Sequence, residues 1–302
     1  MKTSTKKFEK PILKWSGRKY PLLKSIIQNI PNDLNSTYFE PFLGSGSVFL
    51  NVVDSKSFQK YVLNDSLNEL ILSYKIIKNS NVNTLSKDIK KIENTYNSKR
   101  NPNTRSSLYY QKRNEYNLLL EKENLNAIEA KKLTILLLFL NKTCFNGVYR
   151  KNSSGNFNVP HGKRASKNQK VNLVTAEELI LFSKKLSVAN LQSKDYKKSI
   201  SSAKNNDFVY LDPPYVKTVN YYGVEKFDEE ESLELKEEID KLTSRNVKVL
   251  MSNSNTEMTK DIFANKSYFY KELSATRTIE RRTENKGNKT SNELLIANFK
   301  LI

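Results

Sequence analysis

Short apolar, β-rich runs alternate with helical patterns at both ends of this 302-residue chain. This alternation is typical of an α/β protein, in which helices cover a mostly parallel sheet. The middle of the chain, residues 79–174, is instead mostly helical, polar and basic. We therefore predict one sheet domain, formed by residues 1–78 and 175–302, with residues 79–174 inserted into it as a second domain.

The expected strands and helices follow from apolar periodicity and from turn residues. A β-hairpin is expected where two short runs, 145–150 and 157–160, flank a glycine-containing turn. The expected strands are Tyr38–Leu43, Tyr61–Asn64, Phe208–Leu211, Val247–Ser252, Tyr268–Glu272 and Leu294–Phe299. The expected helices include Ser47–Val53, Leu67–Lys78, Leu108–Lys122, Ala127–Asn141 and Glu229–Arg245.

Charge and composition narrow the function classes. Lys and Arg number 51 and Asp and Glu 32, so the net charge is +19. Such a charge suits a polyanionic partner, because basic side chains release counterions from phosphates, although a lysine- and asparagine-rich proteome would raise it as well. The single cysteine, Cys144, excludes an internal disulfide framework, and the single histidine, His161, argues against histidine triads and multi-histidine metal sites.

Targeting signals are not expected. The segment Met1–Lys10 is polar and does not resemble a signal peptide. No apolar run approaches the ~20 residues that a membrane helix needs. Together with the lack of paired cysteines, this predicts an intracellular, cytoplasmic protein with no membrane partner.

A glycine-containing turn follows the first expected strand. Residues 38–47 run through Gly44 and Gly46 into a helix, and glycines let a backbone approach a ligand closely. The three spaced glycines of the full dinucleotide pattern are missing, which counts against NAD. Asp65 ends the next expected strand, about 20 residues on, where such folds place a ribose-binding carboxylate. The pair favours an adenosine-containing cofactor, although the glycines could serve tight packing alone and Asp65 could be a helix N-cap.

A second motif, Asp212-Pro-Pro-Tyr215, directly follows an apolar strand. Its prolines end the strand and stiffen a turn at the sheet edge where ligands bind in open α/β sheets. The Asp212 carboxylate and the Pro213 carbonyl could accept both N–H bonds of an adenine amino group, which would localise its lone pair without a metal or a histidine. Tyr215 could stack on the base, an interaction worth about 1–3 kcal/mol. Such chemistry requires a base outside the duplex, whereas a rigid turn with a chance tyrosine is the structural alternative.

In this order the motifs resemble the Dam-type family of DNA adenine N6-methyltransferases, over nearly the whole chain. Lys14–Lys19 is similar to the family's N-terminal cofactor motif, and residues 42–46 to its glycine motif. Residues 144–150 and 157–163 are similar to its recognition hairpin, and residues 212–215 to its catalytic motif. The resemblance implies a Rossmann-like domain that binds S-adenosylmethionine (AdoMet), releases S-adenosylhomocysteine and needs no metal.

The resemblance also implies roles for single residues. The catalytic set is Asp212, Pro213 and Tyr215. The cofactor-binding set is Trp15, Lys19, Phe42, Gly44, Gly46, Asp65, Asp195, Tyr196 and Asp212, with Asp195 and Tyr196 where the family tends to bracket the cofactor adenine. The DNA-binding set is Lys14, Phe145, Asn146, Val148, Arg150, Pro160 and Lys163.

Four of the DNA-binding residues have a specific expected chemistry. Arg150 could pair with a guanine edge, and Val148 or Pro160 could touch a thymine methyl group. Phe145 could wedge into the base stack, or it could instead form a cross-strand pair with Phe157 that holds the hairpin.

Departures from the family pattern affect the target more than the reaction. Arg18 stands where the family usually has a second glycine, and Lys163 where relatives often have arginine, whose planar fork is lost. A GATC-type site in double-stranded DNA is the expected target, and nucleoid association is the expected location. A cognate restriction endonuclease is a candidate partner, and the basic loop with Arg281 and Arg282 is a candidate source of phosphate contacts.

Two other function classes stay open. An RNA adenine or protein amide methyltransferase would share the fold, but protein-amide enzymes typically have asparagine in place of Asp212, and the hairpin and the charge favour duplex DNA over RNA. A catalytically inactive basic DNA-binding module is the third possibility. The intact glycine and Asp-Pro-Pro-Tyr motifs argue against it.

Overall fold

The protein is described here from a computed structural model, which covers the chain outside residues 1–7, 18, 163–168, 215–227, 265–266 and 277–289. The described strands form one seven-stranded sheet in the order β3-β2-β1-β4-β5-β7-β6. Strands β1 to β5 pair in parallel, whereas β7 is antiparallel to both of its neighbours. The strands are β1 Asp33–Glu40, β2 Phe58–Asn64, β3 Ala189–Gln192, β4 Phe208–Leu211, β5 Lys248–Ser254, β6 Phe269–Thr276 and β7 Thr290–Ala297. The predicted α/β fold class is confirmed.

The strand order reverses beside β1, which pairs with β2 on one side and β4 on the other. Tyr38 lies opposite Phe208, and Phe39 opposite Val209. Ligands of open α/β sheets bind outside the carboxyl ends of the strands at such a reversal. Both sequence motifs, the glycine turn and Asp212-Pro-Pro, directly follow these two strands.

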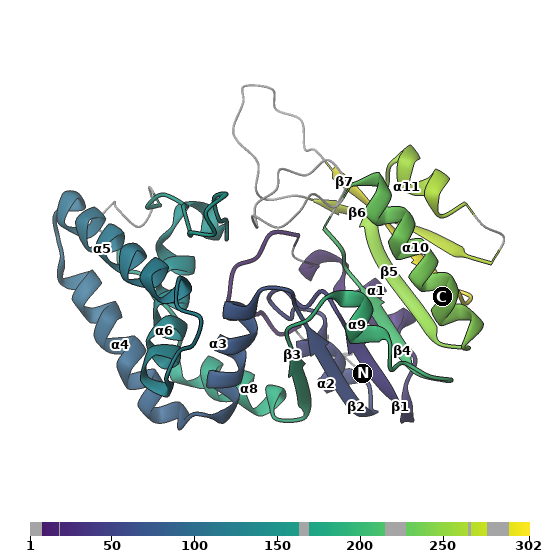
Figure 1. Cartoon of the computed structure of the whole chain (residues 1–302), viewed down its shortest axis with the longest axis horizontal. Coiled ribbons are helices and arrows are strands. Elements are labelled where there is room, and N and C mark those ends of the chain that lie inside the picture. The colour runs from purple at the N-terminus through teal and green to yellow at the C-terminus, as the bar shows by residue number, and fades with distance from the viewer. Residues whose placement is uncertain (1–7, 18, 163–168, 215–227, 265–266, 277–289) are drawn as a thin grey trace, which may run out of the picture.

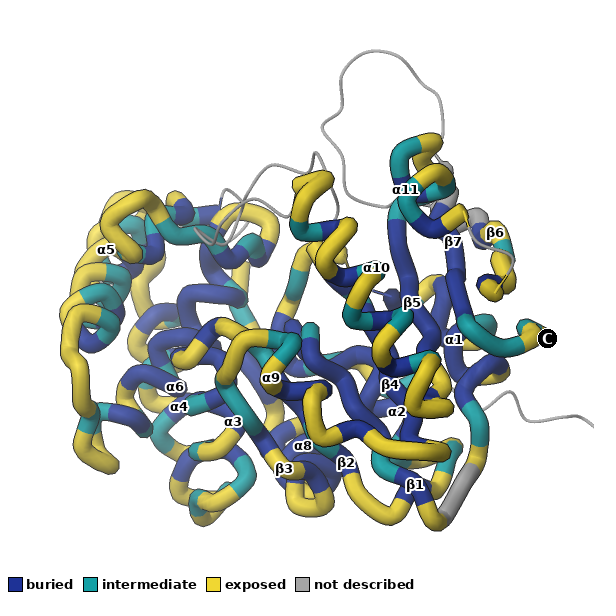
Figure 2. Tube along the Cα trace, turned by 45° about the vertical axis from the view of Figure 1, so that its right-hand side comes forward, coloured by how far each residue is buried: buried dark blue, intermediate teal, exposed yellow. Residues whose placement is uncertain are grey.

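Different helices cover the two faces of the sheet (Figure 1). Phe208 and Tyr210 of β4 enter one cluster of buried side chains, while Val209 and Leu211 enter the other, as the twofold alternation of a strand requires. Figure 2 shows the strands as a buried layer between helices whose outer sides are exposed. The helices around the sheet are α1 Leu23–Asn29, α2 Phe49–Ser55, α3 Asn68–Asn79, α8 Ala176–Leu186, α9 Tyr196–Ile200, α10 Glu229–Ser244 and α11 Glu257–Ile262.

A group of three long helices lies beside the sheet, packed against α3 and α8 (Figure 1). These are α4 Val82–Ser98, α5 Pro102–Leu120 and α6 Ala127–Thr143. The asparagines that precede them are their N-caps: the side chains of Asn81, Asn101 and Asn126 accept hydrogen bonds from backbone N–H groups of the first turn. Pro102 begins α5, ahead of Leu108, where the sequence predicted the start of this helix. Proline suits this position, because the N–H that it lacks would be unpaired there.

Strand β3 is absent from the sequence-based prediction. Its residues, Ala-Asn-Leu-Gln, include no apolar run, and Asn190 is exposed. As an edge strand it needs only one hydrogen-bonding neighbour, and pairing with β2 supplies it. Tertiary pairing therefore defines this strand, and local composition does not.

The expected hairpin is an antiparallel pairing held by two isolated bridges, Cys144 with His161 and Lys151 with Phe157. Its first arm has more residues between these bridges than its second. The surplus forms the 3-10 turn η2, Phe145–Gly147, which we call the recognition turn. The irregular pairing explains why neither arm is a regular strand.

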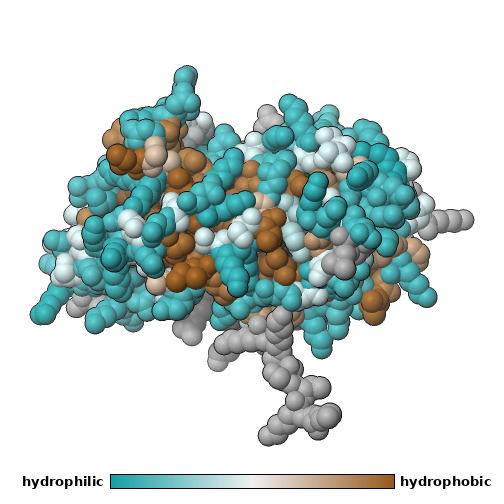
Figure 3. Space-filling view, turned by 90° about the horizontal axis from the view of Figure 1, so that it is seen from below, coloured by the Kyte–Doolittle hydropathy of each residue, from teal (hydrophilic) through white to brown (hydrophobic). Residues whose placement is uncertain are grey.

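Among the residues that the structure describes, no helix is both long enough and apolar enough to cross a membrane. The face shown in Figure 3 is largely hydrophilic, with hydrophobic residues gathered near its middle.

Candidate active site

The glycine turn after β1 is a tightly packed, positive-φ turn. Gly44 and Gly46 have φ values of +49° and +70°, a region that favours glycine. The Gly44 N–H donates to Asp65 Oδ2 at 2.8 Å, and the Tyr74 hydroxyl donates to the Gly44 carbonyl at 2.8 Å. A Cβ on Gly44 would lie 2.8 Å from the Trp15 indole. The structure thus brings three predicted cofactor residues, Trp15, Gly44 and Asp65, to one turn.

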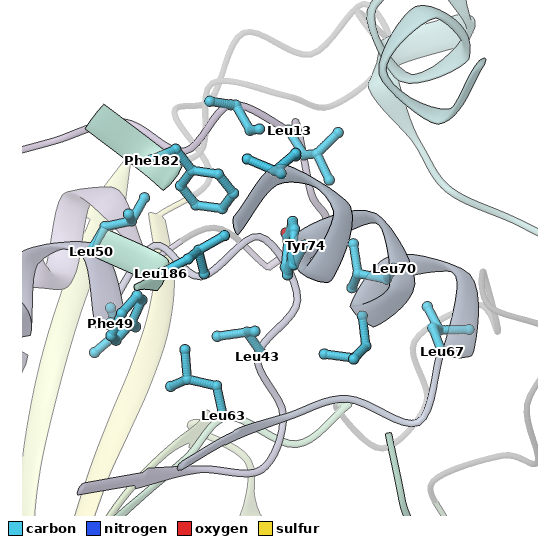
Figure 4. Close-up of a cluster of buried hydrophobic side chains, with 14 of the residues drawn as sticks. Leu13, Leu43, Phe49, Leu50, Leu63, Leu67, Leu70, Tyr74, Phe182 and Leu186 are labelled. Atoms are coloured by element: carbon cyan, nitrogen blue, oxygen red, sulfur yellow. The ribbon is translucent and has the colours of Figure 1, made fainter. Parts of the chain in front are cut away.

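A buried cluster beneath this turn fixes it to the domain. The side chain of Leu43 lies with Leu63, Tyr74 and Leu186 (Figure 4). Leu43 is the residue directly before Gly44, so its burial holds the turn in place.

Asp65 combines the two roles that the sequence left open. Its Oδ1 accepts from the Leu67 N–H at 3.1 Å, just before α3, while Oδ2 holds the glycine turn. Burial raises the pKa of Asp65 to about 6, although the N–H groups of Leu67 and Gly44 oppose that rise. The residue is still partly exposed, which leaves it accessible to a ligand.

An ion-pair cluster surrounds Asp212 at the end of β4. Lys19 Nζ lies 2.9 Å from Asp212 Oδ1 and 3.4 Å from Glu293 Oε2, and it donates to the Gly17 carbonyl at 3.1 Å. The Lys19 side chain is 1% exposed, whereas that of Asp212 is 23% exposed. Lys19 therefore anchors the aspartate from the protein side, and the aspartate keeps an open side.

Glu293, on β7, is a site residue that the sequence analysis missed. The available signal is an acidic residue at the head of the apolar run Leu294–Ala297, in a strand that pairs beside β5. A carboxylate that is buried in a sheet is rare unless a charged or hydrogen-bonding partner is beside it, so Glu293 indicates such a partner.

The protonation states follow from burial and from this pairing. Burial raises the pKa of Asp212 to about 6, Lys19 opposes the rise and Glu293 adds to it. Burial alone would lower the pKa of Lys19, but Asp212 and Glu293 raise it above its ordinary value. Glu40, at the end of β1, is 3% exposed, and burial raises its pKa to about 8 although the Tyr38 hydroxyl donates to it at 2.6 Å. Ion pairing thus favours the charged form of Lys19, while burial favours the neutral form of Glu40.

Phe42 and Tyr196 meet next to the glycine turn, with ring centroids 5.1 Å apart and planes tilted by 34°. This is ordinary aromatic contact, so no purine ring fits between the two. A base would have to stack on the outside of the pair. Asp195 is exposed and caps α9, where its Oδ1 accepts from the Lys197 N–H at 2.9 Å.

Most of the predicted DNA-binding residues that the structure describes are exposed, either in the recognition turn or in the segments beside it. Phe145 is 43% exposed, and its N–H donates to the Pro160 carbonyl at 2.9 Å, which brings the two arms together. Arg150 and Val148 are half-buried, and Arg150 Nε donates to Asn158 Oδ1 at 2.7 Å. The exposed residues of this set are Lys14, Phe145, Asn146 and Pro160.

The proposed cross-strand pair of Phe145 with Phe157 is wrong. Phe157 is buried, and it packs instead on Tyr116 and Tyr149. The surplus residues of the first arm turn Phe145 outward, which is the orientation that a wedge requires. Tyr215, Lys163, Arg18, Arg281 and Arg282 lie outside the described residues.

Comparisons with known proteins identify the family of this chain. Residues 15–279 match the family model described as D12 class N6 adenine-specific DNA methyltransferase. The type II methyltransferase M.MjaIII of Methanocaldococcus jannaschii is 32% identical over 303 residues, which covers 96% of this chain and 99% of that protein. The type II methyltransferase M1.LlaDCHI of Lactococcus lactis subsp. cremoris is 30% identical, with 96% and 95% covered. The DNA adenine methylase of Escherichia coli K12 is 32% identical over 264 residues, 84% of each chain.

The family match spans the glycine turn, the recognition turn and the catalytic motif. It confirms the predicted resemblance and the predicted reaction class: the chain is an AdoMet-dependent enzyme that methylates adenine in DNA. The chain therefore belongs to the D12 class of N6 adenine-specific DNA methyltransferases.

Proposed function

We propose that the target adenine is turned out of duplex DNA and that its amino group is held by two oxygens, Asp212 Oδ and the Pro213 carbonyl. The observation that supports this proposal is the position of Asp212. It follows β4 at the strand-order reversal, beside the glycine turn, and Lys19 anchors it at 2.9 Å. Two acceptors on one amino group favour a localised lone pair on N6 and stabilise the positive charge that develops there.

The residues at the turn fit AdoMet. Gly44 and Gly46 allow the backbone to approach a ligand, and the carboxylates of Asp65 and Asp212 suit a cofactor with a cationic centre. When bound, AdoMet supplies an electrophilic methyl group on a sulfonium. We assign Trp15 and Phe42 to its binding surface, with Tyr196 beside Phe42.

We assign the remaining roles by where the residues lie. Residues 79–174 form the DNA-recognition domain, and Phe145 wedges into the base stack. Arg150 reads a guanine edge, while Val148 and Pro160 touch thymine methyl groups, with Lys14, Asn146 and Lys163 at the backbone. A GATC-type site is the proposed target. A restriction endonuclease of the same site is the proposed partner, because two relatives are type II methyltransferases, and the proposed location is the cytoplasm, at the nucleoid.

The reaction and the base extrusion can be tested together. Tritiated AdoMet is offered with duplex DNA, single-stranded RNA or protein, and methylated adenines are mapped by sequencing. Label in N6-methyladenine at GATC-type sites supports the proposal, and label at other sequences overturns the target assignment. A duplex with 2-aminopurine at the target position should brighten on binding, since an extruded base loses its stacking.

The role of Asp212 has its own test. Asp212→Ala should nearly abolish kcat yet leave DNA affinity within a few-fold, because its main interaction is made during transfer. Retention of most of the wild-type kcat would remove Asp212 from the catalytic set.

A further inference from the structure

We propose that Asn141 is a positioning residue, which fixes the recognition turn to the segment Lys14–Trp15 and so sets the DNA interface relative to the cofactor turn. The inference deepens the proposed function and rests on it, because it uses the roles of Phe145 and Trp15 proposed there. Asn141 itself touches neither DNA nor cofactor in this assignment.

One buried amide joins three parts of the chain. Asn141 is in the last turn of α6 and is 2% exposed. Its Oδ1 accepts from the Lys14 N–H at 2.8 Å, and its Nδ2 donates to the Lys14 carbonyl at 2.8 Å and to the Gly147 carbonyl at 3.3 Å. Both peptide groups of Lys14 and the end of the recognition turn are thus bound to the same side chain.

The segment Lys14–Trp15 is also locked by close packing at two glycines. Gly147 has a φ of +67°, and a Cβ there would lie 2.4 Å from Lys14 Cδ. At the other end, a Cβ on Gly44 would lie 2.8 Å from the Trp15 indole. The Trp15 ring stacks on Tyr149, with centroids 5.6 Å apart and planes at 17°. The segment therefore cannot shift without moving the recognition turn, the cofactor turn or both.

The position of Phe145 depends on this lock. Asn146 and Gly147, the two residues after Phe145, both have positive φ, a conformation that asparagine and glycine adopt more readily than other residues. The hydrogen bond from Asn141 to the Gly147 carbonyl fixes the end of that turn. Without it, the turn can relax, and Phe145 loses its fixed direction relative to Gly44.

The test compares Asn141→Ala and Asn141→Asp with the wild-type enzyme. Asn141→Asp keeps the size and the acceptor for the Lys14 N–H but places oxygen against the Lys14 and Gly147 carbonyls. We expect both variants to raise the KM for DNA about tenfold, because Asn141→Ala loses three buried hydrogen bonds and Asn141→Asp loses the two that Nδ2 donates. They should also reduce the 2-aminopurine signal and weaken AdoMet binding, which calorimetry measures without DNA.

Asn298→Ala is the matched control. Asn298 Oδ1 accepts from the Val249 N–H, and its Nδ2 donates to Thr243 Oγ1 and to the Val247 carbonyl, each at 2.8 Å. Thr243 lies near the end of α10, Val247 directly precedes β5 and Val249 lies at its start, at the opposite end of the strands from the site. We expect the melting temperature of Asn298→Ala to fall as that of Asn141→Ala does. Its KM for DNA, its 2-aminopurine fluorescence and its AdoMet affinity should stay at the wild-type values.

Several outcomes would overturn the inference. It fails if Asn141→Ala changes only the melting temperature, or if Asn141→Asp keeps the wild-type KM for DNA. Should the Asn141 variants not fold, Gly147→Ala tests the same lock from the turn, because its Cβ would displace Lys14, and wild-type behaviour of that variant contradicts the proposal. A wild-type enzyme that shows no 2-aminopurine signal would instead contradict base extrusion, so the two failures are distinguishable.

Discussion

At the scale of single residues, the state of Asp212 depends on its two charged neighbours. Burial and Glu293 raise its pKa, Lys19 lowers it, and the result is a value of about 6 against an ordinary 3.8. A carboxylate that must accept a hydrogen bond loses this ability when it is protonated. Because the aspartate is ionised only above its pKa, the pH range of activity is set by these neighbours.

We expect kcat/KM to fall as the pH drops through about 6, with the protonation of Asp212. The pKa of Asp212 is higher in the folded state than in the unfolded state, so between pH 3.8 and about 6 the folded state binds more protons at this residue. Acidification through this range therefore stabilises the fold at Asp212, and the loss of activity is not caused by unfolding at this group. A pH–rate profile with circular dichroism at each pH checks this. Activity that persists unchanged at pH 5 would contradict it.

The fall of kcat/KM at low pH, which we call the acid limb, should shift when either charged neighbour of Asp212 is neutralised. Neutralising Glu293 and neutralising Lys19 should shift it in opposite directions. Glu293→Gln removes a charge that raises the pKa of Asp212, so the limb moves to lower pH. Lys19→Gln removes the charge that lowers it, so the limb moves to higher pH. The control Lys78→Gln removes a lysine that binds the Ala189 carbonyl on β3, and it should leave the limb in place. Shifts of the same sign in both site variants would refute this electrostatic account.

The sequence predicted the separate parts of this site but not their connection. Lys19 and Asp212 were each assigned from a motif, yet their ion pair depends on how the N-terminal segment crosses the sheet edge. Glu293 and Asn141 carry no motif, and their partners are distant in sequence. Such contacts are set by topology, so a motif search does not find them.

At the scale of elements, the recognition turn is the clearest case of tertiary structure overriding a local pattern. Two short runs around a glycine-containing turn predict a hairpin, but two positive-φ residues convert part of its first arm into a 3-10 turn. This conversion separates Phe145 from Phe157 and exposes it. Helix α6 lies close to its expected range, Ala127–Asn141, whereas α5 begins at Pro102 and not at the expected Leu108, and α4 is not among the helices named from the sequence.

Arg150 should determine one base pair of the target. Asn158 holds its Nε at 2.7 Å, which fixes the plane of the guanidinium. We expect Arg150→Ala to relax selectivity at one position by about 1–3 kcal/mol, as for the loss of a bidentate base contact. Methylation rates on duplexes with single substitutions measure this. Uniform weakening over all sequences would make Arg150 a phosphate contact instead.

At the scale of the whole molecule, the net charge of +19 is consistent with a polyanionic substrate, since the chain belongs to a family of DNA methyltransferases. The alternation of strands and helices was sufficient to predict the fold class. The order of the strands, with β7 between β5 and β6, was not predictable, because pairing of distant strands leaves no trace in local composition.

DNA affinity should fall steeply with salt. Each neutralised phosphate contributes about −0.9 to the slope of log K against log salt, and Lys14→Ala should reduce the magnitude of that slope by about one. Fluorescence anisotropy between 50 and 200 mM salt, roughly the range over which such binding is lost, measures it. A nearly flat dependence would show that the charge reflects general composition and not DNA contact.

The ion-pair cluster joins residues from the beginning, the later middle and the last strand of the described chain: Lys19, Asp212 and Glu293. A nascent or clipped polypeptide without β7 lacks the carboxylate on one side of Lys19, whatever cofactor turn it has already formed. The set of charges that tunes the pKa of Asp212 is therefore complete only after the last strand has paired into the sheet.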